Sequence, residues 1–224
     1  MAPASGQPRT IRVDPARLPG WLERFAARHG EIDAQVAPEA VRCLAPDGAE
    51  AEILLRWGPL PAGSDPLGDL VDAVGRERTV GVLLVRRKAH AVGVFQGSRL
   101  LLGRHDSHYV QGRTKAGGWS QQRYARRRSN QADRAFAEAA ADARELLLPR
   151  LDELAGLVLG GDGAGVRAVL GEPGLESLAR LAEIGNHPVY PVADPNRGVL
   201  EGFGQVFRTV PIRLNELAQA GGER

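Results

Sequence analysis

The spacing of hydrophobic residues near the N-terminus predicts a helix followed by two strands. Leu18, Trp21, Leu22 and Phe25 recur at helical spacing behind Asp14-Pro15, a pair that suits the N-cap and first position of a helix. Strand-like runs at 40–44 and 51–57 are joined by a turn, Pro46-Asp47-Gly48. We therefore expect residues 1–9 to be a disordered tail and residues 10–75 to form an N-terminal α+β element, which ends in a Pro- and Gly-rich linker at 58–68.

The next hydrophobic runs have the length of strands and lie close together. Residues 80–87 (VGVLLVRR) are almost continuously apolar, which is typical of a central strand. Residues 89–95 and 99–102 follow across short turns, and residues 108–111 form a candidate fourth strand. Spacings this short indicate antiparallel hairpins.

From about Ser120 the hydrophobic period changes to that of a helix. No Gly or Pro occurs between Ser120 and Leu148, and Phe136, Ala140, Ala143 and Leu147 recur on one helical face. Pro149 kinks or ends this helix.

The remaining chain predicts alternating short elements. They are a strand at 157–159, helices near 164–170 and 174–184, a loop with a helical turn at 193–204, and a closing strand at 205–214. This order predicts an α/β (α+β) fold of the ribonuclease-H-like sandwich type, with a mixed sheet and one long helix. We expect it to span residues 76–217, ahead of a disordered tail at 218–224.

Composition narrows the class of protein. The chain has 224 residues, of which 43% are hydrophobic and 25% charged, as in ordinary globular proteins. No apolar run is long enough to cross a bilayer, which favours a cytoplasmic protein without a membrane partner. The single cysteine, Cys43, excludes an internal disulfide and is expected to be a buried core thiol.

Positive charge is concentrated around the start of the long helix. Between Arg104 and Arg134 there are eight Lys and Arg residues against two acids, whereas the whole chain carries only +2. Such a cluster is typical of a surface that meets a polyanion. A solvated helix face is the ordinary alternative for a run of arginines.

The segment VQGRTKAGGWSQQRYARRRSNQ (110–131) carries the candidate chemistry. Gly117 and Gly118 lead into a helix N-terminus, where free backbone N–H groups suit a phosphate or an oxyanion. The alternative for the same two glycines is a tight connection with no ligand. Trp119 offers a face for a nucleic-acid base, or it packs onto the sheet. The candidate RNA contacts are Arg113, Lys115, Trp119, Arg123, Arg126, Arg127 and Arg128.

The string Gly118-Trp119-Ser120-Gln121, between a predicted strand and an arginine-rich helix, resembles the GxxQ loop of the Vms/ankyrin-zinc-finger-type release factors. That family is related to the middle domain of eukaryotic class I peptide-release factors, and the segment is most similar to its bacterial, actinobacterial-type branch. The resemblance implies release of a stalled nascent chain from peptidyl-tRNA on the large ribosomal subunit. It assigns the functional glutamine to Gln121 and the shaping of the loop to Gly118.

Side-chain chemistry limits what Gln121 can do. An amide has no useful pKa, so Gln121 can position an attacking water or hydroxyl but cannot be a general base. Two reactions stay open: hydrolysis of the peptidyl-tRNA ester, and attack of a ribose 2′-hydroxyl that cuts the tRNA near its CCA end. A non-catalytic RNA- or ribosome-binding module that uses the basic helix is the alternative function.

Other constellations in the sequence favour structural roles. The predicted strands at 80–88 and 89–103 hold no carboxylates, which argues against a two-metal nuclease, and no cofactor motif is present. DNA is not an expected partner. His105 and His108, on either side of Asp106, are expected to be strand-end or loop residues, and Gly160-Gly161-Asp162-Gly163 lacks the Lys of a P-loop and is interpreted as a turn.

Overall fold

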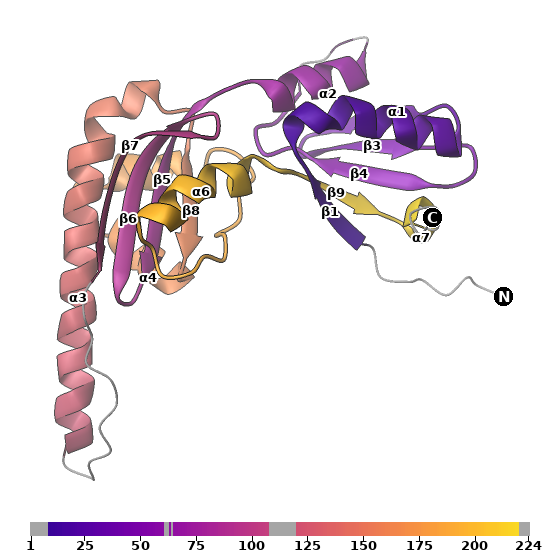
Figure 1. The fold of residues 1–224 in the computed structure, drawn as a ribbon. Helices are drawn as coiled ribbons and strands as arrows, with labels where there is room; N and C mark the ends of the chain where they lie inside the picture. The colour runs from indigo at the N-terminus through magenta and orange to yellow at the C-terminus, as the bar shows by residue number, and fades with distance from the viewer. Residues whose placement is uncertain (1–8, 61–62, 64, 108–119, 220–224) are drawn as a thin grey trace. The chain divides into compact units, whose positions relative to one another are not determined.

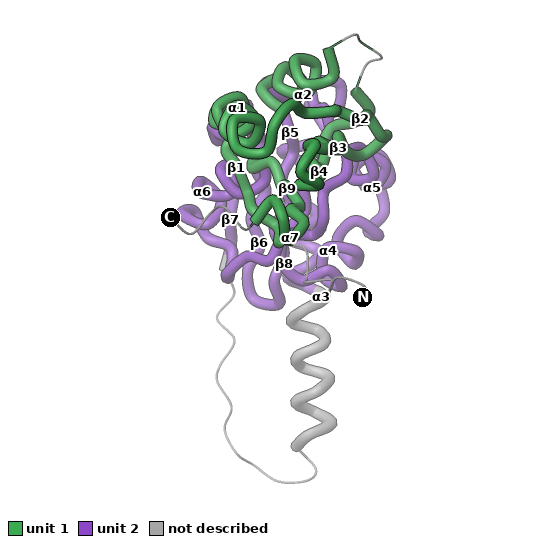
Figure 2. The backbone as a smooth tube through the Cα atoms, turned by 90° about the vertical axis from the view of Figure 1, so that its right-hand side faces the viewer, with its two compact units in different colours: residues 1–76, 208–224 green, residues 77–207 purple. Residues whose placement is uncertain are grey.

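In the computed structural model the chain folds as two units, which Figure 2 shows in different colours. Unit 1 comprises residues 1–76 and 208–224, and unit 2 comprises residues 77–207. The structure describes residues 9–60, 63, 65–107 and 120–219, without the side chains of residues 107 and 120–133.

Unit 1 is a five-stranded antiparallel sheet with the order β1-β9-β4-β3-β2. Its strands are β1 (Arg9–Val13), β2 (Asp33–Ala37), β3 (Ala40–Leu44), β4 (Glu50–Leu54) and β9 (Val210–Leu214). Its helical segments are η1 (Pro15–Arg17), α1 (Leu18–His29), α2 (Pro66–Gly75) and α7 (Glu216–Gln219). The inward residues of β3, β4 and β9 form one core with the apolar stripe of α1, including Leu18, Leu22 and Phe25.

The predicted start signal ahead of α1, Asp14-Pro15, acts close to where it was expected. The Asp14 side chain accepts a hydrogen bond from the Ala16 backbone N–H at 2.9 Å and so caps the short η1 turn, with Pro15 at its first position. Helix α1 then begins at Leu18. It ends at Gly30, whose φ of 100° belongs to the left-handed region that favours glycine.

Unit 2 is built on a mixed four-stranded sheet with the order β7-β6-β5-β8. Its strands are β5 (Thr79–Arg86), β6 (Ala89–Gln96), β7 (Arg99–Ser107) and β8 (Leu157–Gly161). Strands β5, β6 and β7 pair antiparallel, and β8 pairs parallel to β5. Its helical segments are α3 (Ser120–Leu147), η2 (Leu148–Glu153), α4 (Gly163–Leu170), α5 (Glu176–Leu181) and α6 (Arg197–Arg208).

Helices cover both faces of this sheet, so unit 2 has three layers (Figure 1). Leu83 and Val92 face the side on which α3, α4 and α5 pack into one hydrophobic cluster. Phe95 faces the opposite side, where its ring meets Phe207 of α6 edge to face at a centroid distance of 5.5 Å. The predicted α/β layering, the mixed sheet and the long helix over 120–148 are confirmed.

The C-terminal strand differs from the prediction. The sequence places 205–214 in the domain that spans 76–217, whereas β9 lies in the sheet of unit 1, between β1 and β4. A strand of five residues can join any sheet that offers an unpaired neighbour, and its own pattern does not identify that neighbour.

Helix α6 is the second difference, because the sequence predicts a loop with a helical turn over 193–204. The glycines at 198, 202 and 204 argue against a helix by propensity. Tertiary packing overrides them: Leu200, Phe203 and Phe207 are all buried on one face of α6.

Strands β1 and β2 and helix α2 are also absent from the prediction. The predicted strand 108–111 lies outside the described residues, while β7 is longer than expected.

None of the helices in the described part of the chain is long and apolar enough to span a membrane.

Candidate nucleic-acid interface

The residues predicted to carry chemistry fall around the N-terminus of α3. This helix begins at Ser120, so Gln121 lies in its first turn and Arg123, Arg126, Arg127 and Arg128 lie in the following turns. Gly118, Trp119, Arg113 and Lys115 lie outside the described residues, as does His108. The structure therefore gives the helical positions of five predicted site residues and no side-chain geometry for them.

The C-terminal half of α3 is fixed against the sheet by close packing. Ala139, Ala140 and Ala143 are completely buried, and they pack in the same cluster as Val92 and Val94 of β6. Side chains this small let the helix backbone approach the strands closely. The helix that carries Gln121 is thus anchored at its far end by an extensive apolar contact.

A polar network adds to this anchor. The imidazole Nε2 of His90 on β6 lies 2.9 Å from Oδ2 of Asp142 on α3, and the Arg104 guanidinium of β7 donates to Oδ1 of Asp142 at 3.3 Å. Arg104 also donates through both terminal nitrogens to the carboxylate of Glu145, one turn further along α3. The network joins two strands to one helix face.

Charge complementarity within the network shifts two ionisation equilibria. The hydrogen bonds from Arg104 lower the pKa of Glu145. The hydrogen bonds to Glu145 and then to Asp142 raise the pKa of Arg104 further above its ordinary range. Both shifts favour the charged forms, so the pair stays ionised near neutral pH.

A further contact fixes the same helix to the segment ahead of α5. Arg144 of α3 donates from Nε and Nη2 to the backbone carbonyl of Pro173, at 3.2 and 2.6 Å. The C-terminal half of α3 is thereby held by β6, β7 and the 171–175 connection.

The Gly160–Gly163 segment has a structural role, as predicted, although it is the direct junction of β8 with α4 and not a separate turn. Gly161 has a φ of 100°, and its N–H donates to the carbonyl of Tyr190 at 2.8 Å. The Asp162 N–H donates to the carbonyl of Val85 at 2.7 Å, and the Asp162 side chain accepts from the N–H of Ala164 as the N-cap of α4. These amides are engaged within the fold, so they do not form a phosphate cradle.

His105 and Cys43 have the structural settings that the sequence predicts. His105 and Asp106 are exposed positions on β7, paired in register with Ala91 and His90. Cys43 is fully buried, and burial raises the pKa of its thiol to about 11. No group of three or more His, Cys, Asp or Glu side chains that could hold a metal ion occurs among the described residues.

Sequence reasoning missed the His90–Asp142–Arg104–Glu145 network. One signal was present: Asp142 and Glu145 are three residues apart and therefore share a helix face. Another was that His90 interrupts an otherwise apolar strand. Pairing these residues across 38 to 52 positions of sequence required the register of β6 and β7 and the contact with α3.

Residues 78–213 match the family described as "Actinobacteria/chloroflexi VLRF1 release factor". The peptide chain release factor subunit 1 of Aeropyrum pernix is 31% identical over 96 residues, which cover 42% of this chain and 26% of that protein. The chain thus spans about a quarter of that relative.

Among solved structures, the crystal structure of an archaeal translation termination factor, aRF1, matches with a TM-score of 0.39 and 16% identity. That match covers 88% of this chain and 64% of the aRF1 chain. A second archaeal protein gives the same values.

Proposed function

Because the chain belongs to the Actinobacteria/Chloroflexi VLRF1 release factor family, which its residues 78–213 match, we propose that it releases nascent peptides from peptidyl-tRNA on stalled ribosomes or large ribosomal subunits. Its partners would then be the large ribosomal subunit and peptidyl-tRNA, in the cytoplasm and without a cofactor. The same assignment makes it a hydrolase or a tRNA-cleaving enzyme in ribosome quality control.

One observation carries this proposal: the matched region contains the start of α3 at Ser120, directly behind Gly117-Gly118-Trp119. A functional glutamine at position 121 then occupies the first turn of a 28-residue helix. The end of a helix that is packed against a sheet is a suitable place for a group that must reach into another molecule and still be held in position.

The proposed role of each residue follows from the chemistry of its side chain. Gly118 shapes the loop, and Gln121 holds the attacking group in line with the bond to be broken. Arg113, Lys115, Arg123, Arg126, Arg127 and Arg128 contact tRNA or ribosomal RNA phosphates, and Trp119 stacks on a base. Arginine suits this role because its planar fork binds a phosphate through two parallel hydrogen bonds.

Two reactions are compatible with this assignment, and each balances without a cofactor. In the first, water positioned by Gln121 attacks the ester carbonyl, and the tRNA leaves with an intact 3′ hydroxyl. In the second, a ribose 2′-hydroxyl attacks the adjacent phosphodiester, the downstream 5′ oxygen leaves, and a cyclic phosphate remains. Arginines would stabilise the phosphorane in the second reaction.

The experiment is peptide release from purified large subunits that carry peptidyl-tRNA. Gln121→Ala should slow release by about a hundredfold, the scale expected when an attacking group loses its position. Gln131→Ala, a change of the same kind further along α3, serves as the matched control. Equal release by the wild type and Gln121→Ala would overturn the catalytic role.

Analysis of the tRNA 3′ end in the same reactions distinguishes the two chemistries. An intact CCA-OH end indicates ester hydrolysis, and a shortened end indicates cleavage of the tRNA. Binding to the subunits with no release by either wild type or variant would instead support a non-catalytic ribosome-binding module.

A further inference from the structure

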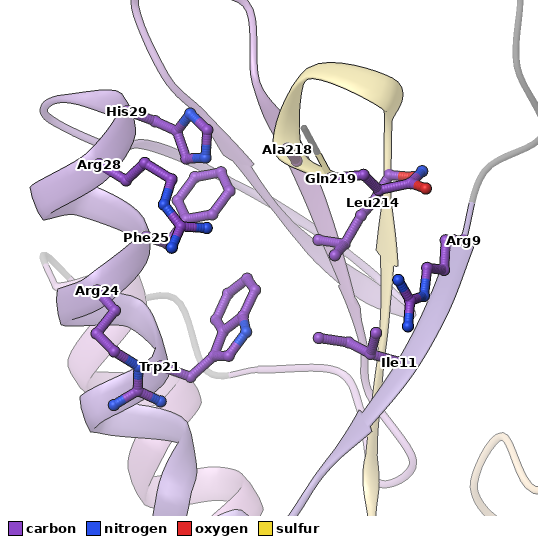
Figure 3. A pocket seen from close by; sticks show the side chains of 10 residues that line it. All are labelled: Arg9, Ile11, Trp21, Arg24, Phe25, Arg28, His29, Leu214, Ala218 and Gln219. Atoms are coloured by element: carbon purple, nitrogen blue, oxygen red, sulfur yellow. The ribbon is translucent and has the colours of Figure 1, made fainter. Parts of the chain in front are cut away.

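Unit 1 contains a cavity whose lining combines aromatic and cationic side chains. It has a volume of about 280 Å³ and lies between α1 and the strands β1 and β9 (Figure 3). Trp21, Arg24, Phe25 and Arg28 reach it from α1, and Arg9 reaches it from β1 on the opposite side. The residues from α1 share one helix face because they are spaced by three or four positions.

The aromatic part of the lining offers a flat apolar surface. Trp21 is half-buried and stacks on the buried ring of Phe25, with centroids 5.3 Å apart and an interplanar angle of 22°. Phe25 in turn contacts the ring of His29, which lines the same cavity. This stack fixes the indole ring in one orientation before any ligand arrives.

The cationic part has no anionic counterpart among the residues that the structure describes. Within that part of the chain, no Asp or Glu lines the cavity, and neither Arg9, Arg24 nor Arg28 forms an ion pair. By contrast, Arg104 and Arg213 are both paired with carboxylates. Three exposed guanidinium groups around one cavity therefore leave a local excess of positive charge.

A buried polar atom at the same cavity also lacks a partner. The Nδ1 atom of His29 lies 2.8 Å from Oδ2 of Asp47, whereas its Nε2 atom is buried and has no hydrogen-bond partner among the described residues. The His29 side chain is only 6% exposed. Buried polar groups are nearly always hydrogen-bonded, so an unpartnered one beside a cavity points to a ligand.

We infer that this cavity binds one unpaired nucleotide of an RNA strand, with its base on Trp21 and its phosphates at Arg9, Arg24 and Arg28. The volume lies just below the usual range of small-molecule pockets, about 300–1,000 Å³, and suits a single base whose backbone stays outside. Stacking on an aromatic ring beside a positive groove is the common way of binding single strands. Arginine clusters without an aromatic platform would fit a phosphopeptide better.

RNA binding at this cavity does not depend on the release reaction, because Gln121 and the basic helix belong to unit 2. It can therefore be measured on the intact protein without ribosomes. The probe is a fluorescein-labelled, single-stranded ten-nucleotide RNA, compared with a duplex of the same length and with a singly phosphorylated peptide.

Arg24→Gln/Arg28→Gln should weaken binding of the single strand at least about fivefold and lower its salt dependence. The matched control is Arg12→Gln/Arg17→Gln, which removes the same charge from exposed positions that do not line the cavity. Trp21→Leu should also weaken binding at least about fivefold, since it removes the stacking surface. Equal losses in the two double variants would overturn the inference, as would stronger binding of the duplex or of the phosphopeptide.

A local readout separates this cavity from the arginines of α3. In a Trp57→Phe/Trp119→Phe variant, Trp21 is the one remaining tryptophan of the three in the chain. Stacking of a base should quench its fluorescence as RNA is added, and Arg24→Gln/Arg28→Gln should shift the quenching to higher RNA concentration. No quenching at saturating RNA would overturn the inference, even if peptide release by the wild type proceeds as proposed.

Discussion

The buried imidazole of His90 and the carboxylate of Asp142 lie 2.9 Å apart, and together they tie the second strand of unit 2 to its longest helix. The His90 side chain is 3% exposed and that of Asp142 is 24% exposed. If α3 presents Gln121 to the ribosome as proposed, this pair holds the opposite end of that helix against the sheet. Weakening it should affect both the stability of unit 2 and the position of the first helical turns.

Asp142→Ala should lower the free energy of unfolding by about 1–3 kcal/mol, because Nε2 of the buried His90 ring would lose its partner. Urea unfolding of the purified proteins measures this change. Asp152→Ala, an acidic position exposed on η2, is the control and should change stability by no more than about 0.5 kcal/mol. Equal effects of the two substitutions would contradict a role for the His90 contact.

Glu145→Gln should destabilise the protein at neutral pH but not in acid. The hydrogen bonds from Arg104 hold the pKa of Glu145 below its ordinary 4.5 in the folded state. A carboxyl whose pKa is depressed on folding contributes stability above its unfolded pKa, and that contribution is lost as the pH falls through the folded pKa. The difference in unfolding free energy between wild type and variant should thus shrink below about pH 4. A constant difference from pH 7 to pH 3 would contradict this, and Glu153→Gln is the matched surface change.

Two glycines of the same helix should respond in opposite directions to replacement by alanine. A Cβ on Gly204 would lie 2.1 Å from the backbone carbonyl oxygen of Ser98, so Gly204→Ala should cost about 1–3 kcal/mol or more. A Cβ on Gly202 would meet nothing within 4 Å, so Gly202→Ala should stabilise by about 0.5–1 kcal/mol through helix propensity. Thermal unfolding of both variants tests the close approach of α6 to the β6–β7 turn.

Arg126→Gln should weaken binding to ribosomal subunits and reduce the steepness of its salt dependence. Each lost contact with the phosphate of a single strand lowers the slope of log K against log salt by about 0.7. Arg134→Gln is the control on the same helix, since Arg134 is already paired with Glu138 at 3.0 Å. If the slope is unchanged for both variants, the basic face of α3 is only a solvated surface.

Cys43 should resist alkylation in the native protein. With a pKa of about 11, only about one thousandth of this thiol is ionised at pH 8, and its side chain is completely buried. Because it is the single cysteine of the chain, labelling by iodoacetamide reports the opening of unit 1 specifically. Rapid labelling without denaturant would show that unit 1 opens easily.

Strands β5 and β9 show which features of the fold can be predicted from sequence. Strand β5 is a continuous apolar run, and its central position follows from that pattern alone. Strand β9 is equally apolar at most positions, yet its partners β1 and β4 lie about 160 to 200 residues earlier. Local patterns predict that a strand forms, whereas the choice of its sheet depends on contacts distant in sequence.

The two candidate sites show the same limit: local signals are predictable from sequence, and contacts between distant segments are not. The start of α3 near Ser120 was predictable because Gly117-Gly118 and the change of hydrophobic period after them are local signals. The cavity around Trp21 was not, since Arg9 and Gln219 reach it from opposite ends of the chain. Trp21 and Phe25 look like ordinary core residues until the strand that faces them is known.

The return of the C-terminal strand to the first sheet has a consequence for synthesis of the protein. Strand β9 lies between β1 and β4, so these two strands do not pair with each other, and the strand that joins them follows the whole of unit 2 in the sequence. Unit 2, whose residues 77–207 are contiguous, can complete its fold while the first sheet is still unfinished. During synthesis unit 2 can therefore complete its fold before unit 1, although unit 1 begins earlier in the sequence.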